Sequence, residues 1–108
     1  MAQLERDLTG DFDETLCRLH DGILNASMSA SYESGADWSG GGARCALRVY
    51  ERYSWSGGNR VSMTLQLCGE GRRLHLTAIT AGGSQALLWK VNTIGEEAFL
   101  DTLRGLLP

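Results

Sequence analysis

Between Ala43 and Val91 the sequence contains four short stretches in which apolar and polar residues mostly alternate, and glycine-rich turns separate them. Alternation with a period of two is typical of β-strands that bury one face. The stretches cover residues 43–50, 61–67, 73–78 and 86–91. Their connections are short, so neighbouring strands must pair antiparallel. The last stretch is apolar on both faces, which predicts that both are covered or that the strand lies at a contact with another molecule.

An amphipathic helix is predicted on each side of this strand block. The first follows Asp11 and Glu14, which have the spacing of a capping box, and Asn25 is a suitable stop. Its apolar stripe recurs at helical spacing and consists of Phe12, Leu16, Leu19 and Ile23. The second helix would begin at the capping pair Thr93 and Glu96. Its stripe consists of Ile94, Phe99, Leu103 and Leu106.

The segments before the strand block complete the expected fold. Gln3–Thr9 alternates weakly and predicts a short edge strand, and residues 27–32 alternate serine with larger residues, which predicts another strand. Ser34–Gly42 has no residues that could bury a face, so we expect a mobile loop there. Residues 1–108 should therefore form a single α+β domain. We expect a two-layer sandwich of about five or six antiparallel strands with two helices packed on one face.

Cysteine usage and hydropathy bear on the cellular compartment. The three cysteines, Cys17, Cys45 and Cys68, have neither the number nor the spacing of a disulfide framework or a metal site. Their neighbours are apolar, so we expect inert core thiols, and the odd count fits a reducing compartment. The longest purely apolar run, Ala86–Trp89, is far shorter than the ~20 residues of a membrane span. We therefore expect a soluble cytoplasmic protein with no membrane partner.

Charge points to one candidate binding surface. The formal net charge is −3, but residues 1–40 carry a net −6, residues 41–90 a net +5 and residues 91–108 a net −2. The strand block is thus basic and the helical ends are acidic. If the alternating apolar residues face the helices, the open sheet face carries the candidate ligand-binding residues Arg44, Arg48, Tyr50, Arg52, Arg73 and His75. Arginines beside hydroxyl groups could hold a small anionic ligand.

Other interpretations of these residues stay open. The polar face could be an ordinary solvated surface that resists aggregation. Nucleic acid is disfavoured as a partner, because the net charge is negative and an RNP-type aromatic motif is absent from the sequence. Trp38, Trp55 and Trp89 lie in or beside predicted loops, where they could line an apolar pocket or close the core.

Motifs for catalysis, metals and cofactors are weak. Gly82–Ala86 is close to the G-x-S-x-G nucleophile elbow, but alanine replaces the last glycine and a strand is expected to follow. A glycine turn is the better interpretation. His20 near Cys17 and Asp21 would need further ligands from elsewhere in the fold to bind a metal. The sequence has no Walker loop or dinucleotide fingerprint, so we expect no cofactor.

Three stretches resemble a small bacterial family of unknown function: Val49–Ser54, Gly57–Ser62 and Ala78–Ala86. The similarity would span nearly the whole chain, and it implies an uncharacterised domain with no activity to carry over. The order of strands and helices is also similar to helix-grip, lipid-binding folds. The short C-terminal helix and the single first helix depart from those folds, which argues against a large internal cavity.

The leading hypothesis is a binding or interaction domain without catalytic activity. The doubly apolar stretch Ala86–Val91 predicts a homo-oligomer. The alternative is a binder of small anionic or apolar ligands that uses the open face or the tryptophan loops. An enzyme of unknown class is the third hypothesis, with His75 and Ser84 as the residues to test.

Overall fold

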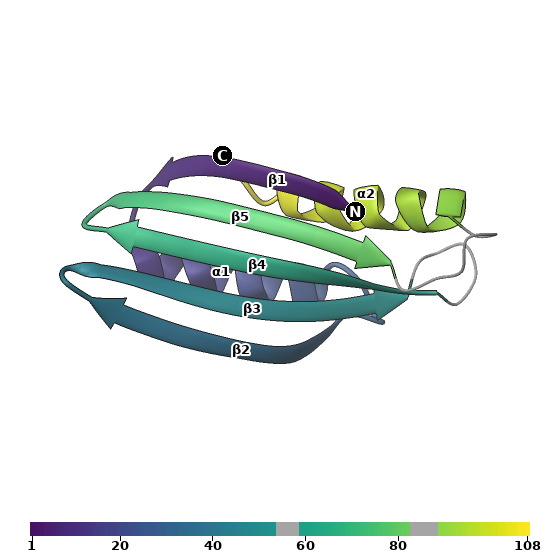
Figure 1. The fold of residues 1–108 in the computed structure, drawn as a ribbon, viewed down its shortest axis with the longest axis horizontal. Coiled ribbons are helices and arrows are strands. Elements are labelled where there is room, and N and C mark those ends of the chain that lie inside the picture. Colours follow the sequence, from purple (N-terminus) through teal and green to yellow (C-terminus); the bar gives the residue numbers. More distant parts are fainter. Residues whose placement is uncertain (54–58, 83–88) are drawn as a thin grey trace.

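The structure, a computed structural model, describes residues 1–53, 59–82 and 89–108 (Figure 1). Its elements in chain order are β1 (Ala2–Thr9), α1 (Phe12–Asn25), β2 (Ser31–Gly40), β3 (Ala43–Tyr53), β4 (Arg60–Glu70), β5 (Arg73–Gly82) and α2 (Trp89–Arg104). The strands form one antiparallel sheet in the order β1-β5-β4-β3-β2, and both helices pack on the same face (Figure 1). The predicted α+β class is confirmed.

The sheet combines a meander with one distant pairing. Strands β2 to β5 each pair with the next along the chain, and β1 pairs with β5, from Ala2 opposite Thr80 to Thr9 opposite Arg73. The predicted edge strand at Gln3–Thr9 is therefore confirmed. The predicted turn between β4 and β5 is also confirmed, because Gly71 has a φ of +62°, a left-handed conformation that glycine favours.

The predicted loop at Ser34–Gly42 is wrong. Residues 34–40 continue β2 along the sheet edge, and pairing with β3 extends to Gly40 opposite Ala43. The predicted strand at 27–32 is correct only from Ser31 onward. An edge strand takes its hydrogen bonds from one neighbour and needs no buried face, so a fully exposed sequence does not exclude a strand.

The predicted strand at Ala86–Val91 is also wrong where the structure describes it. Trp89–Val91 form the first turn of α2, whereas residues 86–88 lie outside the described residues. The sequence observation that suggested a homo-oligomer therefore loses its structural basis. The predicted glycine turns at 56–59 and 81–84 lie largely outside the described residues as well.

Helix α1 follows the sequence prediction closely. Asp11 is its N-cap, and the side-chain carboxylate accepts a hydrogen bond from the Glu14 backbone N–H at 2.9 Å. The helix ends at Asn25 as expected. Three members of the predicted stripe, Phe12, Leu19 and Ile23, are buried against the sheet, and the fourth is partly buried.

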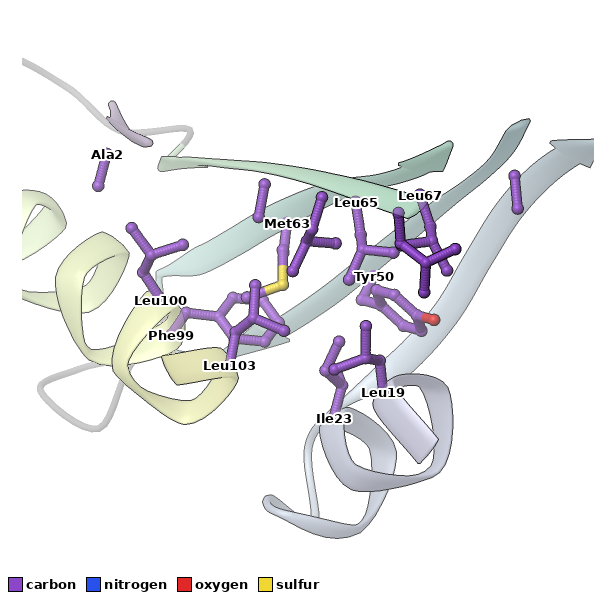
Figure 2. Close-up of a cluster of buried hydrophobic side chains, with 14 of the residues drawn as sticks. Ala2, Leu19, Ile23, Tyr50, Met63, Leu65, Leu67, Phe99, Leu100 and Leu103 are labelled. Atoms are coloured by element: carbon purple, nitrogen blue, oxygen red, sulfur yellow. The ribbon is translucent and has the colours of Figure 1, made fainter. Parts of the chain in front are cut away.

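The core lies between the helices and the covered face of the sheet (Figure 2). Leu19 and Ile23 reach it from α1, and Phe99, Leu100 and Leu103 reach it from α2. The sheet contributes Tyr50, Val61, Met63, Leu65, Leu67, Leu74, Leu76 and Ala78. The inward-facing residues of β4 and β5 are those that the alternation predicted.

The second capping box predicted at Thr93 and Glu96 is wrong, because α2 begins earlier, at Trp89. Glu96 instead is buried within the helix, and its carboxylate accepts a hydrogen bond from the Gly82 N–H at 2.7 Å. The Thr80 hydroxyl donates to the Glu96 carbonyl at 3.0 Å. These two bonds satisfy buried polar groups and fix α2 to the end of β5.

Candidate functional site

The side chains of β3 alternate in the opposite sense to the prediction. Ala46 and Tyr50 are fully buried on the helix side of the sheet, whereas Leu47 is 37% exposed on the opposite side. Four of the six predicted binding residues therefore lie on the covered face, namely Arg44, Arg48, Tyr50 and Arg52. Arg73 and His75 lie on the open face as predicted.

Arg44 lies on the covered face because its guanidinium has two partners on α1. It lies 4.1 Å from the centroid of the Phe12 ring, and its two terminal nitrogens donate to the Asp13 carboxylate at 2.9 and 3.0 Å. A cation over an aromatic ring and a bidentate carboxylate pair are both geometries that favour arginine. The Arg44 hydrogen bond lowers the pKa of Asp13.

Arg52 makes the equivalent contact with α2. Its guanidinium lies 4.4 Å from the centroid of the Phe99 ring, and it donates to the Thr102 hydroxyl at 3.2 Å. Burial lowers the pKa of Arg52. The long stems of both arginines can lie against the core while the charged groups reach its rim. These two arginines therefore hold the helices on the sheet and do not form an open anion site.

Arg48, the third arginine of β3, lies in a groove between α1 and strands β2 and β3. The groove has a volume of about 350 Å³ and is lined by Asp13, Leu16, Cys17, His20, Tyr32 and Arg48. We call it the α1 groove. Its volume is at the lower end of the range for small-ligand sites, and its wall combines apolar, aromatic and charged groups.

Aromatic side chains form the floor of the α1 groove. His20 Nδ1 and Tyr50 Oη lie 2.7 Å apart and share a hydrogen bond, which gives the fully buried tyrosine its polar partner. The Tyr32 ring lies edge-on to His20, with 5.4 Å between centroids. Gly35 makes room for Tyr32, because an added Cβ would meet the Tyr32 hydroxyl and would lie 2.7 Å from the Leu47 carbonyl oxygen.

Charged and thiol groups lie at the rim of the α1 groove. Arg48 pairs with Asp37 at 3.1 Å and donates to the Leu47 carbonyl at 2.9 Å. Cys17 is exposed and its thiol donates to the Asp21 carboxylate at 3.5 Å, which raises the thiol's pKa. The prediction of an inert core thiol is wrong for the position of Cys17.

Two ionisable groups at the α1 groove have raised pKa values. The raised pKa of Cys17 favours the neutral thiol, and burial raises the pKa of Tyr50, which favours the neutral phenol. Neither raised pKa favours the anionic form that a nucleophilic attack requires.

The open face carries a different set of groups. Cys45 on β3 lies directly opposite Cys68 on β4, with their Cα atoms 4.1 Å apart, and the two form a disulfide. The prediction of inert core thiols is wrong for this pair too, because both are only half-buried and lie on the face without helices. A pairing across two strands depends on register, which the spacing of three cysteines along the chain does not reveal.

His75 is held on this open face by two carboxylates of β1. Its Nδ1 lies 2.8 Å from Asp7 Oδ1, and its Nε2 lies 3.3 Å from Glu5 Oε1. Both hydrogen bonds raise the pKa of His75, and the bond to Asp7 has the larger effect. His75 also lies opposite Cys68 in the pairing of β4 and β5. An imidazolium ion is therefore favoured beside the disulfide.

A shallow groove of about 540 Å³ runs beside Cys68 on the open face. Its polar lining comes from Asp7, Thr9, Glu70, Arg73 and His75. We call it the Cys68 groove. It contains both residues of the predicted site that remain on the open face.

Trp38, the tryptophan whose side chain the structure describes, lines neither the α1 groove nor the Cys68 groove. Trp38 lies on β2 opposite Cys45 and is 62% exposed. Trp55 lies outside the described residues, and Trp89 begins α2. Within the described ranges, no group of three or more His, Cys, Asp or Glu side chains could hold a metal ion. The described helices include none long and apolar enough to span a membrane.

Sequence reasoning missed several residues of both grooves. His20 carried a weak signal, because it follows a stripe residue of α1 and has a neighbouring acid. Tyr32 lies in a stretch whose alternation predicted a strand, but nothing in the sequence indicated which residues it would contact. The cysteine pair had no signal in spacing and depends on the register of two strands.

Residues 1–107 of the chain match the model of DUF6054, described as a family of unknown function. No curated protein and no solved structure matches the chain significantly.

Proposed function

The chain belongs to a family of unknown function, DUF6054, and from its grooves we propose that it is a non-catalytic binding domain for a small ligand. The observation that carries the proposal is the convergence of Arg48, His20 and Tyr32 in the α1 groove. Three separate elements supply these side chains, which gives the groove a fixed shape. The neutral states favoured for Cys17 and Tyr50 support binding over reaction.

The lining of the groove indicates a small anion with an apolar ring. Leu16 and Tyr32 offer apolar surface for a ring, and the guanidinium of Arg48 in the same groove can pair with a carboxylate. Asp37, the present partner of Arg48, is 67% exposed, so an anionic ligand can replace it at low cost. The acid in the lining of the groove, Asp13, is paired with Arg44.

The test is an NMR titration with phenylacetate, and with benzyl alcohol as the neutral comparison. We expect phenylacetate to shift the resonances of His20 and Leu16, and we expect Arg48→Met to weaken binding at least about tenfold, as loss of a charge-assisted bond predicts. Arg60→Met is the matched control, because Arg60 pairs with Glu51 on the opposite face. Equal binding by the Arg48 and Arg60 variants, or no shift with phenylacetate, would contradict the proposal.

A homo-oligomeric interaction domain is the second candidate, favoured by the edge strand β2. Nine of its ten residues are exposed, and it contains neither lysine nor proline, the residues that usually protect an edge. Its two acids, Glu33 and Asp37, pair with Arg60 and Arg48 of the same chain. Two copies of β2 could therefore pair antiparallel without strong repulsion.

Light scattering at increasing protein concentration tests this second candidate. We expect a dimer mass that Ala36→Lys on β2 removes, because the lysine places a charge on each of the two paired edge strands. Gln3→Lys on the other edge strand is the matched control. A monomer at every concentration would exclude the dimer.

A further inference from the structure

The open face aligns chemically distinct groups in one row across five strands. The row runs from Trp38 on β2 through Cys45 and Cys68 to His75 on β5 and Asp7 on β1. Both helices lie on the other side of the sheet, so neither covers this row (Figure 1). A dissolved reagent can therefore approach the sulfur atoms from the solvent side.

The two cysteines need no backbone movement to bond or separate. They are register partners on β3 and β4, and the pairing of β3 with β2 and of β4 with β5 holds both strands in place. The sheet thus keeps the sulfur atoms close in the reduced state as well. Oxidation and reduction can proceed without unfolding.

His75 gives the two sulfur atoms different surroundings. It is the register partner of Cys68 on the neighbouring strand, and adjacent strands are roughly 4.8 Å apart, whereas Asp7 and Glu5 lie on β1, one strand further from Cys68. The cross-strand neighbour of Cys68 is therefore a positively charged group, which favours the thiolate. The other charged groups of the Cys68 groove are Glu70 and Arg73, nearer the turn. Cys45 lies further from His75 and beside Trp38.

We propose that Cys45 and Cys68 form a thiol–disulfide exchange site, with Cys68 as the attacking sulfur, Cys45 as the resolving sulfur and a small-molecule disulfide as the partner. The Cys68 groove offers space for that partner beside the attacking sulfur. The site lies on the opposite face from the α1 groove, so it does not depend on ligand binding there.

The exchange balances without a further reagent. The Cys68 thiolate attacks one sulfur of the disulfide RSSR, the Cys68–SR bond forms, and one RS⁻ leaves and takes a proton from solvent. The Cys45 thiolate then attacks Cys68 Sγ, the Cys45–Cys68 bond forms, and the second RS⁻ leaves and is protonated. One RSSR is reduced to two RSH while the two thiols are oxidised to one disulfide.

Mass spectrometry with glutathione disulfide as the probe tests the assignment, in a Cys17→Ala background that removes the other thiol. We expect Cys45→Ala to accumulate one glutathione on Cys68, and Cys68→Ala to modify Cys45 more slowly. With both cysteines present, the intramolecular disulfide should form and reverse with reduced glutathione. Equal rates at the two sulfurs would overturn the assignment of roles, and failure of the pair to oxidise would overturn the site.

The effect of His75 gives a second, independent measurement on folded protein. His75→Gln should raise the pKa of Cys68 and slow its modification below that pKa by about threefold per unit, because lower thiolate content is partly offset by greater nucleophilicity. The pH at which the rate of modification rises should shift to a higher value together with this pKa. Gln66→Glu, which adds a charge on the same face, serves to gauge general electrostatic effects. An unchanged pH profile of the modification rate in His75→Gln would overturn the proposed effect of His75 on the Cys68 thiolate. Circular dichroism establishes that each variant is folded.

Discussion

The two faces of the sheet use their polar side chains in different ways. On the covered face, Arg44 and Arg52 stack on Phe12 and Phe99, and each is held by a polar group of the same helix. On the open face, the cysteine pair is backed by no helix and is approached by solvent. Charged residues on β3 thus stabilise the packing of the helices, whereas the cysteine pair, Cys45 on β3 and Cys68 on β4, lies on the face that neither helix covers.

The largest difference between the faces should come from truncating leucines. Leu67→Ala on the covered face removes a fully buried side chain and should lower the free energy of unfolding by about 2–5 kcal/mol. Leu47→Ala on the open face should lower it by less than about 1 kcal/mol, because Leu47 is already 37% exposed. Urea denaturation of both variants measures this. Similar losses would mean that something covers the open face in solution.

Reducing the disulfide should have the next largest effect. The bond closes a loop with a sequence separation of 23, and a loop of that size restricts the unfolded chain enough to contribute about 3 kcal/mol. Urea denaturation with and without dithiothreitol gives the difference. The double variant with alanine at both cysteines is the control, and it should not respond to the reductant. A difference near zero would mean that the disulfide does not contribute to the free energy of unfolding.

Tyrosine hydroxyls provide a comparison of intermediate size. Tyr50→Phe leaves His20 without its buried partner and should cost about 1–3 kcal/mol. Tyr53→Phe removes a hydroxyl from a side chain that is 49% exposed, and it should change stability by less than about 0.5 kcal/mol. Thermal unfolding distinguishes the two. Equal values would mean that the His20–Tyr50 bond is replaced by water without loss.

The smallest effect should be the pH dependence from His75. Its folded-state pKa is raised, so the contribution of its ion pairs is fully present below the unfolded pKa of about 6.5 and is lost as the pH rises through the folded value. NMR titration should give a pKa for His75 above about 6.5, and Asp7→Asn should lower it. Glu14→Gln, remote from this pair, should leave it unchanged. A His75 pKa that ignores Asp7→Asn would contradict the geometry.

Most of the fold was predictable because periodicity reports burial directly. The α1 stripe, its Asp11 cap and the inward residues of β4 follow local rules that the structure obeys. The predicted beginning of α2 was wrong, because Trp89 and Val91 in its first turn also fit the end of an apolar strand. Edge strand β2 was missed because an exposed strand has no apolar pattern to detect.

The candidate sites were less predictable, because they depend on partners far apart in the chain. The alternation in β3 predicted two faces, and the face with more arginine was assigned to solvent. In the structure this face is covered by the helices, because Arg44 and Arg52 stack on aromatic rings of α1 and α2. His75 was placed correctly because its neighbours in β5 alternate cleanly. The disulfide was not predictable from separation alone, since only register sets Cys45 opposite Cys68.

The pairing of β1 with β5 has a consequence for how the chain acquires its fold. Residues 2–9 pair with residues 73–80, so the first strand to be synthesised must wait for the last strand of the sheet. The β2–β5 meander consists of hairpins whose ends are close in sequence, so it can form early at a small cost in loop-closure entropy. The β1–β5 ladder raises the contact order and should slow folding. Until that ladder forms, the edge of β5 is open to pairing with other chains during synthesis.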